Sequence, residues 1–311
     1  MKLKEWLDIW LNKYTKLTVK LRTYDKYKYI IEKHINPKLG NYELDELNFE
    51  IFQDFVLNKL ENGNINTNSK LANNSVIGIV NVLKSSMTFA MSLGKVQKNE
   101  IKKIKLPSPT EKSITAFEKH EQEKLEKYCL NSNKKNHIGI IICLYTGIRI
   151  GELLALTWDD IDFKTGIMSI TKTSYRSTEN EKPKIIIDNP KTKNSNRVIP
   201  LSKTLLYILK KIKKSTQSNY IISTRTGGIV GTRAYQRTYE RILNKLNIPY
   251  KNFHSLRHTF AIRAIEIGVD VKTLSEILGH KNPVITLTRY THSMMSYKTN
   301  MMNKMGKMLV V

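Results

Sequence analysis

The sequence has 311 residues, 40% of them hydrophobic, and carries 52 Lys and Arg against 27 Asp and Glu. The formal net charge of +25 favours a polyanionic partner, most often nucleic acid. A lysine-rich proteome would also produce a basic protein, but an isoelectric point near 9.8 is typical of nucleic-acid-binding domains. The length predicts two domains.

Two cysteines, Cys129 and Cys143, are too few for a disulfide framework, and both stand among apolar residues in helical patterns. We expect them in the core of a protein of the reducing cytoplasm. The N-terminus lacks the apolar stretch of a signal peptide, and the apolar run at 138–145 is too short to cross a bilayer. Neither export nor membrane insertion is expected.

Helical periodicity dominates the first third of the chain. Apolar residues recur with helical spacing over 3–14, and a second helical segment, 18–35, has one apolar side before Pro37 and Gly40 stop it. The basic residues of this second segment either grip phosphates or are simply solvated, and the sequence favours neither alternative. These residues are Lys20, Arg22, Lys26 and Lys28.

Two further helices complete this all-α module. Asn48 is suited to cap a helix that runs to Leu60, and another helix over 69–93 ends at Gly94. The periodicity lapses around 107–109, after which Thr115 and Glu118 form a capping-box signature. We therefore expect a helical DNA-binding domain at 1–106 with net charge +7, a linker at 107–114, a second domain at 115–293 and a tail at 294–311.

The second domain begins with two predicted helices, 116–130 and 137–145. Gly147 ends the second of them, so Arg149 is expected close to a turn. Glu152 stands three residues further on, where its carboxylate can orient the Arg149 guanidinium.

Residues 166–200 contain three β-rich segments separated by polar turns, which predicts an antiparallel ribbon. Lys191 and Lys193 lie in its last turn, at the expected tip of a hairpin. Predicted helices at 201–214 and 232–246 follow. The second of these has an arginine-lined face that either binds DNA or is solvated, formed by Arg233, Arg237 and Arg241.

The stretch HSLRHTFA places His254 and Arg257 three residues apart. A helix that starts near Phe253 would present both side chains on one side. His258 is expected to point elsewhere and to have a structural role.

Four sequence blocks, TGIRIGEL, PKTKNSNRVIPL, HSLRHTFA and LGHKNPVITLTRY, resemble in this order the active-site blocks of the tyrosine recombinases, the phage integrase family. The resemblance spans most of residues 140–292. WLDIWL and HINPKLG are also similar to the SAM-like core-binding domain of the family. The resemblance implies a mainly α protein with a small antiparallel sheet, in which an all-α SAM-like domain precedes an α+β catalytic domain.

The resemblance also assigns roles in phosphodiester transfer. Arg149 and Arg257 would bind the non-bridging phosphate oxygens, which many enzymes neutralise with metal ions. His254 and His280 would donate hydrogen bonds to the same oxygens, and His254 would accept the proton of the nucleophile. That nucleophile would be Tyr290, whose phenol needs a positive pocket or a base at neutral pH.

The general acid for the departing 5′-oxygen would be Lys191, with Lys193 as the alternative. No metal or nucleotide cofactor is implied. The implied assembly is a homotetramer on paired double-stranded DNA sites that exchanges strands through a Holliday junction, inside a bacterial or phage-infected cell at the nucleoid. Accessory directionality or DNA-bending proteins would be further partners.

Three alternatives compete with this interpretation. WDDID at 158–162 suggests a metal-dependent nuclease or transposase, although carboxylates of such sites usually come from separate segments. A DNA-binding protein with an inactive site and a type IB topoisomerase are the others. The methionine-rich tail is expected to dock on a neighbouring protomer, or else on its own domain.

Overall fold

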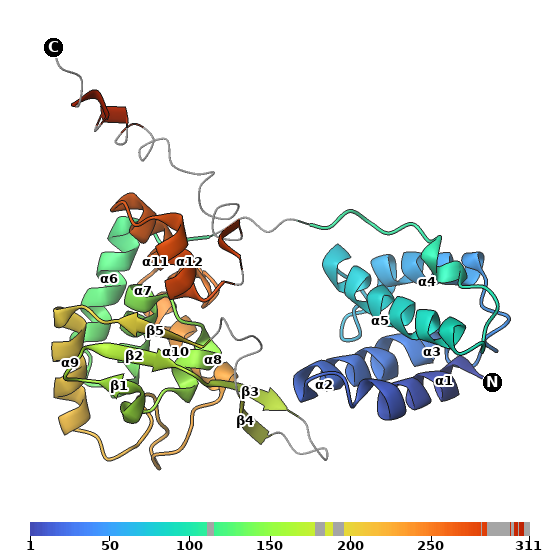
Figure 1. Cartoon of the computed structure of the whole chain (residues 1–311), viewed down its shortest axis with the longest axis horizontal. Coiled ribbons are helices and arrows are strands. Elements are labelled where there is room, and N and C mark those ends of the chain that lie inside the picture. The colour runs from blue at the N-terminus through green and yellow to red at the C-terminus, as the bar shows by residue number, and fades with distance from the viewer. Residues whose placement is uncertain are drawn as a thin grey trace. The chain divides into compact units, whose positions relative to one another are not determined.

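The computed structural model describes residues 1–110, 115–177, 184–188, 196–280, 282–284, 299, 302–303 and 305–307. The chain forms two compact units, Met1–Lys112 and Ser113–Val311, each with its own hydrophobic core (Figure 1). The expected mainly α architecture with small antiparallel sheets is confirmed.

The N-terminal unit is entirely helical in the residues that the structure describes. Trp6 and Leu7 are fully buried in its core, as their helical spacing predicts, and Asn48 caps a helix by accepting a hydrogen bond from the Ile51 amide at 3.0 Å. The elements are α1 (Leu3–Ile9), the π-helix η1 (Trp10–Thr15), α2 (Leu21–Ile30), the π-helix η2 (Ile31–Ile35), α3 (Asn36–Leu39), α4 (Phe49–Asn62), α5 (Asn73–Ser92) and the 3₁₀-helix η3 (Glu100–Lys102).

The expectation that Pro37 stops the second helix is wrong. The chain continues from α2 through η2 into α3, and Pro37 lies in the first turn of α3. Proline is tolerated there because the first amides of a helix need no intrahelical acceptor. The helical path therefore ends only at Gly40.

Among the described residues, one helix, α5, is long and apolar enough to cross a membrane by length and composition alone. Its buried side chains, including Val80 and Leu83, belong to the core of the N-terminal unit. A core helix of this kind passes the same test of length and composition.

The C-terminal unit surrounds the apolar helix α7 (Ile138–Thr146), which packs against α6 (Lys119–Leu130), α8 (Ile150–Ala155) and α11 (Ser255–Glu266). The other helices are η4 (Lys135–His137), η5 (Trp158–Asp160), α9 (Lys203–Lys214), α10 (Thr232–Lys245) and α12 (Val271–Leu278). The strands are β1 (Ile161–Asp162), β2 (Ile167–Ile170), β3 (Thr173–Ser177), β4 (Lys184–Asp188) and β5 (Arg197–Pro200).

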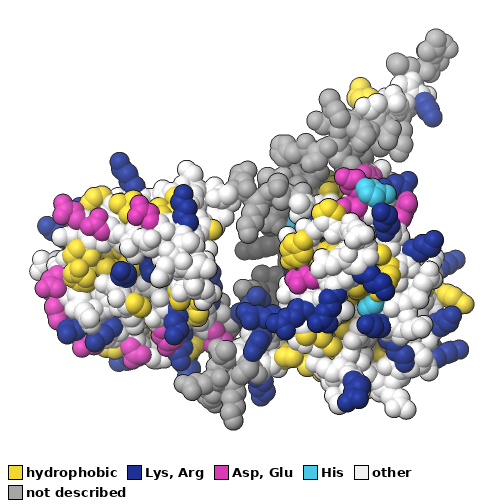
Figure 2. All heavy atoms as spheres, turned by 180° about the vertical axis from the view of Figure 1, so that it is seen from behind, with side chains coloured by type: hydrophobic (Ala, Val, Ile, Leu, Met, Phe, Trp, Pro, Cys, Tyr) yellow, Lys and Arg dark blue, Asp and Glu magenta, His cyan; other side chains and the backbone are white. Residues whose placement is uncertain are grey.

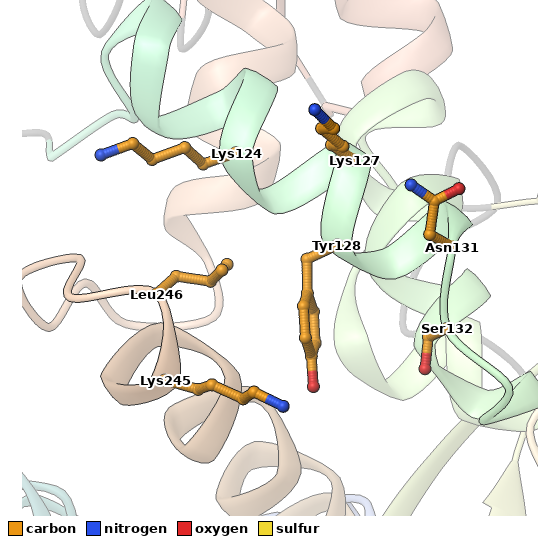
Figure 3. Close-up of a pocket in the computed structure, with 7 residues that line it drawn as sticks. All are labelled: Lys124, Lys127, Tyr128, Asn131, Ser132, Lys245 and Leu246. Carbon is orange, nitrogen blue, oxygen red and sulfur yellow. The ribbon is translucent and has the colours of Figure 1, made fainter.

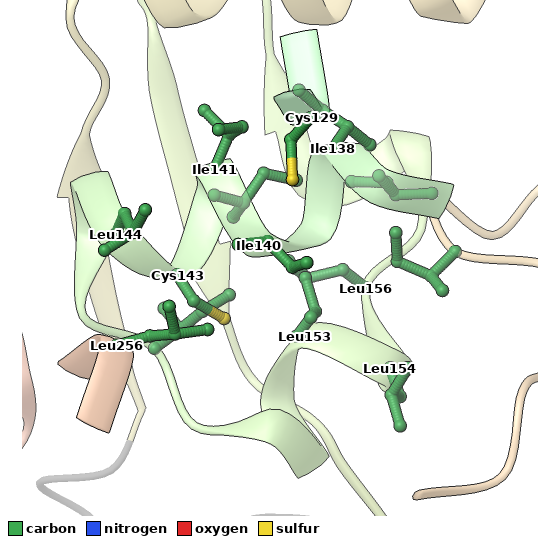
Figure 4. Close-up of a cluster of buried hydrophobic side chains, with 14 of the residues drawn as sticks. Cys129, Ile138, Ile140, Ile141, Cys143, Leu144, Leu153, Leu154, Leu156 and Leu256 are labelled. Atoms are coloured by element: carbon green, nitrogen blue, oxygen red, sulfur yellow. The ribbon is translucent and has the colours of Figure 1, made fainter. Parts of the chain in front are cut away.

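Both cysteines lie in the core around α7, as expected (Figure 4). Burial raises the pKa of Cys129 to about 12 and that of Cys143 even further. Neither thiol is therefore available as a thiolate at neutral pH.

The expected cap of α6 is wrong by three residues. Glu118, not Thr115, precedes the helix, and the Glu118 amide donates to the Glu121 carboxylate at 2.8 Å. The Thr115 hydroxyl instead lies 3.4 Å from that of Ser255, so a tertiary contact outweighs the local capping pattern.

The expected antiparallel ribbon divides into two sheets. β1, β2 and β5 form one sheet in that order, while β3 and β4 form a separate hairpin (Figure 1). In the described residues β4 pairs with β3 and β5 pairs with β2. Lys191 and Lys193, which we expected at the tip of the last hairpin, lie outside the described residues. The segment IMSITKTSY supplies strands to both sheets, which alternation within one strand cannot reveal.

Candidate active site

Arg149 lies at a turn, as its position after Gly147 predicts. Gly147 ends α7 in a left-handed conformation with φ of 65°, and Arg149 is the residue just before α8. The Arg149 side chain is 38% exposed, so its guanidinium can contact a ligand from solution while one side of it is held by the protein.

Glu152 holds that guanidinium. Its buried carboxylate accepts four hydrogen bonds: from the Arg149 amide at 2.9 Å, from Arg149 Nη1 at 2.8 Å, and from Arg197 Nη1 and Nη2 at 3.2 and 2.8 Å. Burial alone would raise the pKa of Glu152, but the hydrogen bond and charge of Arg197 and the charge of Arg149 outweigh it and lower the pKa to about 2. Glu152 is therefore ionised at neutral pH.

Arg257 is 2% exposed and lies on α11, against the end of α7. Its Nη1 donates to the Gly147 carbonyl at 2.7 Å and its Nη2 to the Leu278 carbonyl at 2.8 Å. The guanidinium is thus fixed between two turns, one before Arg149 and one before His280.

Three arginines of this site donate hydrogen bonds to the C-terminal end of α12. Three successive carbonyls, those of Ile277, Leu278 and Gly279, accept from Arg197 Nε at 2.6 Å, Arg257 Nη2 at 2.8 Å and Arg149 Nη2 at 3.4 Å. The two preceding carbonyls accept from the amides of His280 and Gly279. All carbonyls that a helix end leaves unpaired are satisfied, and the partial negative charge of the helix end favours the cations.

The histidines lie at the ends of these helices. His254 is exposed and immediately precedes α11, whereas His280 is half-buried and follows Gly279, whose φ of 65° ends α12. The expectation that His258 points away is wrong, because its ring lies edge-on to that of His254, with centroids 4.6 Å apart. One turn of helix separates the two residues and allows the contact.

Arg197 is the residue of this cluster that the sequence analysis does not single out. Glu152 itself indicated a further cationic partner, because a carboxylate within an apolar helix needs more hydrogen-bond donors than one half-exposed arginine provides. Lys191, Lys193 and Tyr290, the remaining expected catalytic side chains, lie outside the described residues.

The expected DNA-binding residues of the described regions are all exposed. Lys20 precedes α2, which carries Arg22, Lys26 and Lys28, while α10 turns one face to solvent and buries the other. Figure 2 shows Lys and Arg side chains on both units, including a continuous row on the C-terminal unit. The exposed face of α10 carries Arg233, Arg237 and Arg241.

Two of the three carboxylates of WDDID, those of Asp160 and Asp162, bind groups of the protein. Asp160 accepts from the amide and hydroxyl of Thr157 at 2.8 Å each and pairs with Lys172 at 3.0 Å. Asp162 accepts from the Lys164 amide and the Thr165 hydroxyl. Among the residues that the structure describes, no group of three or more His, Cys, Asp or Glu side chains could hold a metal ion.

A surface hollow lies between the C-terminal ends of α6 and α10, apart from the arginine cluster (Figure 3). Tyr128 forms one wall, and the Lys245 ammonium lies 5.2 Å from the centre of its ring. None of the residues around Glu152 lines this hollow. The arginine cluster is therefore the candidate active site.

The depressed pKa of Glu152 predicts a pH-dependent contribution to stability. The contribution is complete above the pKa of about 4.3 that a glutamate has in the unfolded chain, and is lost as the pH falls toward 2. Urea unfolding should show a larger free energy of unfolding for wild type than for Glu152→Gln at pH 5. This advantage of wild type should be about 2 kcal/mol smaller at pH 3. A difference that stays constant over this range would contradict the ionised, paired state.

Gly147→Ala should destabilise the C-terminal unit by about 3 kcal/mol, because it adds left-handed strain and an overlap. A Cβ there would lie 2.5 Å from Phe260 Cδ1 and 2.7 Å from Leu278 Cδ2. Gly268 is the control, since its φ is 92° and nothing lies within 4 Å of an added Cβ. Gly268→Ala should lower the free energy of unfolding by only about 1–2 kcal/mol. If urea unfolding shows equal losses for Gly147→Ala and Gly268→Ala, the overlap at Gly147 is refuted.

Fold and site together define a class of protein: a helical unit followed by an α+β unit in which buried and half-exposed arginines converge on the end of one helix. Residues 112–296 match the family model described as the phage integrase family, and residues 2–60 match the phage integrase N-terminal SAM-like domain. Because the first match covers more than half of the chain, the chain belongs to the phage integrase family of tyrosine recombinases.

Similar proteins agree with this membership. The chain is 30% identical to a tyrosine recombinase XerC-like protein of Caldanaerobacter subterraneus subsp. tengcongensis, over 99% of this chain and 83% of that protein. Its fold is similar to that of the Tn1549 transposon integrase in complex with a circular intermediate DNA, with a TM-score of 0.80, 21% identity, and coverage of 98% and 99% of the two chains. A lambda integrase tetramer bound to a Holliday junction gives a TM-score of 0.71, 19% identity, and coverage of 91% and 78%.

Proposed function

We propose that this protein is a site-specific recombinase that cleaves and rejoins double-stranded DNA through a covalent 3′-phosphotyrosyl intermediate at Tyr290. The observation that carries the proposal is the arginine cluster at the end of α12, in a chain of the tyrosine recombinase family. Arg149 and Arg257 hold permanent positive charges in fixed orientations, which suits them to the extra negative charge of a pentavalent phosphorus.

In the proposed reaction the Tyr290 oxygen attacks the scissile phosphorus and the bond from phosphorus to the 5′-oxygen breaks. His254 accepts the tyrosine proton, and Lys191, or alternatively Lys193, donates a proton to the departing 5′-oxygen. His280 donates a hydrogen bond to the phosphate. Attack by a 5′-hydroxyl of the partner strand reverses these steps, so that the tyrosyl ester conserves the bond energy and no nucleotide is consumed.

Two arginines around one phosphate can replace the charge that a metal ion supplies in many phosphoryl-transfer enzymes. Strand cleavage in excess EDTA would support this chemistry, and cleavage that depends on added metal would favour a nuclease at the WDDID carboxylates instead. The proposal therefore includes no metal and no nucleotide cofactor.

The proposed assembly is a homotetramer on two paired DNA sites that integrates or excises a mobile element or prophage. Its support is the likeness to the Tn1549 integrase complex and to the lambda integrase tetramer on a Holliday junction. We place the reaction in the cytoplasm of a bacterial or phage-infected cell, at the nucleoid, with accessory directionality or DNA-bending proteins as further partners. The tail at 294–311 would dock on a neighbouring protomer, and its deletion without loss of synapsis would argue against this.

The test is to trap the intermediate on a duplex nicked near the scissile phosphate, from which the short 5′-hydroxyl fragment diffuses away. The full chain should form a denaturation-resistant adduct that peptide mass spectrometry locates at Tyr290, and Tyr290→Phe should form none. An inactive DNA-binding protein would give no adduct. Recombination between two defined sites, beyond relaxation of supercoils, distinguishes a recombinase from a type IB topoisomerase.

A further inference from the structure

Arg197 has the most extensive set of contacts around Glu152, although no step of the proposed reaction uses it. Its side chain is 6% exposed at the first residue of β5. Nη1 and Nη2 donate to the two Glu152 oxygens at 3.2 and 2.8 Å, and Nε donates to the Ile277 carbonyl at 2.6 Å. All three guanidinium nitrogens of Arg197 therefore donate to groups of the protein, and Arg197 can act through these neighbours.

We propose that Arg197 is a positioning residue for strand cleavage: through Glu152 it sets the orientation of Arg149, and through Ile277 it fixes the end of α12 that leads into His280. The inference rests on the proposed function and deepens it. It adds a residue that touches no DNA to the machinery that aligns the phosphate.

Glu152 depends on Arg197 for half of its hydrogen bonds. A buried carboxylate is stabilised in its charged form only when its oxygens are fully paired, and Arg149 alone supplies one side-chain and one amide donor. The planar fork of Arg197 supplies two more donors in bidentate geometry. Without this fork Glu152 would rotate or take up a proton, and the guanidinium of Arg149 would lose its fixed orientation.

Arg197 also packs closely against the end of α12. Gly279 has no side chain, and a Cβ there would lie 3.0 Å from Arg197 Cδ and 3.1 Å from Arg197 Nη1. Arg197 thus passes against the backbone of the residue before His280. Because Arg197, Arg257 and Arg149 bind three successive carbonyls, a shift of this helix end would alter all three contacts together.

The decisive variant is Arg197→Lys, which keeps the charge but lacks the fork that reaches two carboxylate oxygens and a carbonyl at once. Arg263→Lys is the matched control, because Arg263 also donates to a carboxylate, that of Glu266, and to a carbonyl, that of Phe117, away from Glu152. Full-length proteins are compared by DNA affinity, by folded fraction and by the single-turnover rate of adduct formation on the nicked duplex.

Arg197→Lys should cleave about 10²-fold more slowly than wild type at equal folded fraction, with a much smaller loss of DNA affinity, as expected when a catalytic group is misplaced. A second substrate carries a methylphosphonate at the scissile position, which removes one charged non-bridging oxygen. On this substrate Arg197→Lys should cleave at most about tenfold more slowly than wild type, because less charge remains for Arg149 to neutralise. Adding Glu152→Gln should slow Arg197→Lys little further, since the two changes disrupt one unit.

The inference is overturned if Arg197→Lys cleaves the ordinary duplex as fast as Arg263→Lys does. It is equally overturned if the variant is slowed by the same factor on both substrates, which would indicate a general structural defect. In both cases wild type still forms the adduct at Tyr290 and the proposed function stands. A wild-type chain that formed no adduct would overturn both proposals.

Discussion

Arg257→Lys is expected to slow strand cleavage by about 10²–10³-fold, the usual effect of losing one preorganised donor to a developing anion. The substitution should also destabilise the protein, because Arg257 joins the turn at Gly147 to the end of α12. A lysine ammonium cannot reach both carbonyls in the same geometry, so one buried carbonyl would lose its donor at a cost of about 1–3 kcal/mol.

Single-turnover cleavage on the nicked duplex measures the first effect and urea unfolding the second. Arg263→Lys again serves as the control, since Arg263 lies on the same helix but pairs with Glu266. Cleavage is compared at equal folded fraction to separate chemistry from stability. A folded Arg257→Lys that cleaves at the wild-type rate would remove Arg257 from the active site.

Lys191→Ala is expected to slow cleavage by about two to four orders of magnitude, the usual contribution of a general acid, whereas Lys193→Ala should have a much smaller effect. The two lysines stand two residues apart in PKTKNSNR, and the assignment to Lys191 rests on family resemblance. The reverse ranking of the two variants would transfer the role to Lys193. If both variants cleaved at the wild-type rate, neither lysine would be the acid.

A substrate with sulfur in place of the departing 5′-oxygen separates proton donation from phosphate binding. A thiolate leaves without protonation because its conjugate acid has a pKa near 8.5, far below that of an alcohol. The rate of Lys191→Ala should therefore return close to that of wild type on this substrate, whereas Arg257→Lys should remain slow. A lysine variant that stays equally slow on the sulfur substrate would indicate a binding role.

Local sequence patterns predicted the parts of the site whose geometry depends on near neighbours. Gly147 ends α7 and places Arg149 at a turn, and the three-residue spacing to Glu152 is realised as an ion pair at 2.8 Å. In each case a residue lacking a Cβ, or a neighbour one helical turn away, determines the geometry.

Contacts between distant segments were not predictable in the same way. Arg197 on β5 and Glu152 on α8 are 45 residues apart and meet only in the folded chain, and Thr115 meets Ser255 across 140 residues. The division of the predicted ribbon into two sheets also depends on which strands meet, whereas periodicity reports only which face is buried.

The four hydrogen bonds on Glu152 have a consequence for the entropy of DNA binding. A free arginine side chain loses about 2 kcal/mol of rotamer entropy when a ligand immobilises it. Arg149 has already lost most of this freedom in the folded protein, because its Nη1 is bound to Glu152 while 38% of the side chain stays exposed. The ordering penalty is thus met when the chain folds, and more of the favourable free energy of each phosphate contact is retained as affinity.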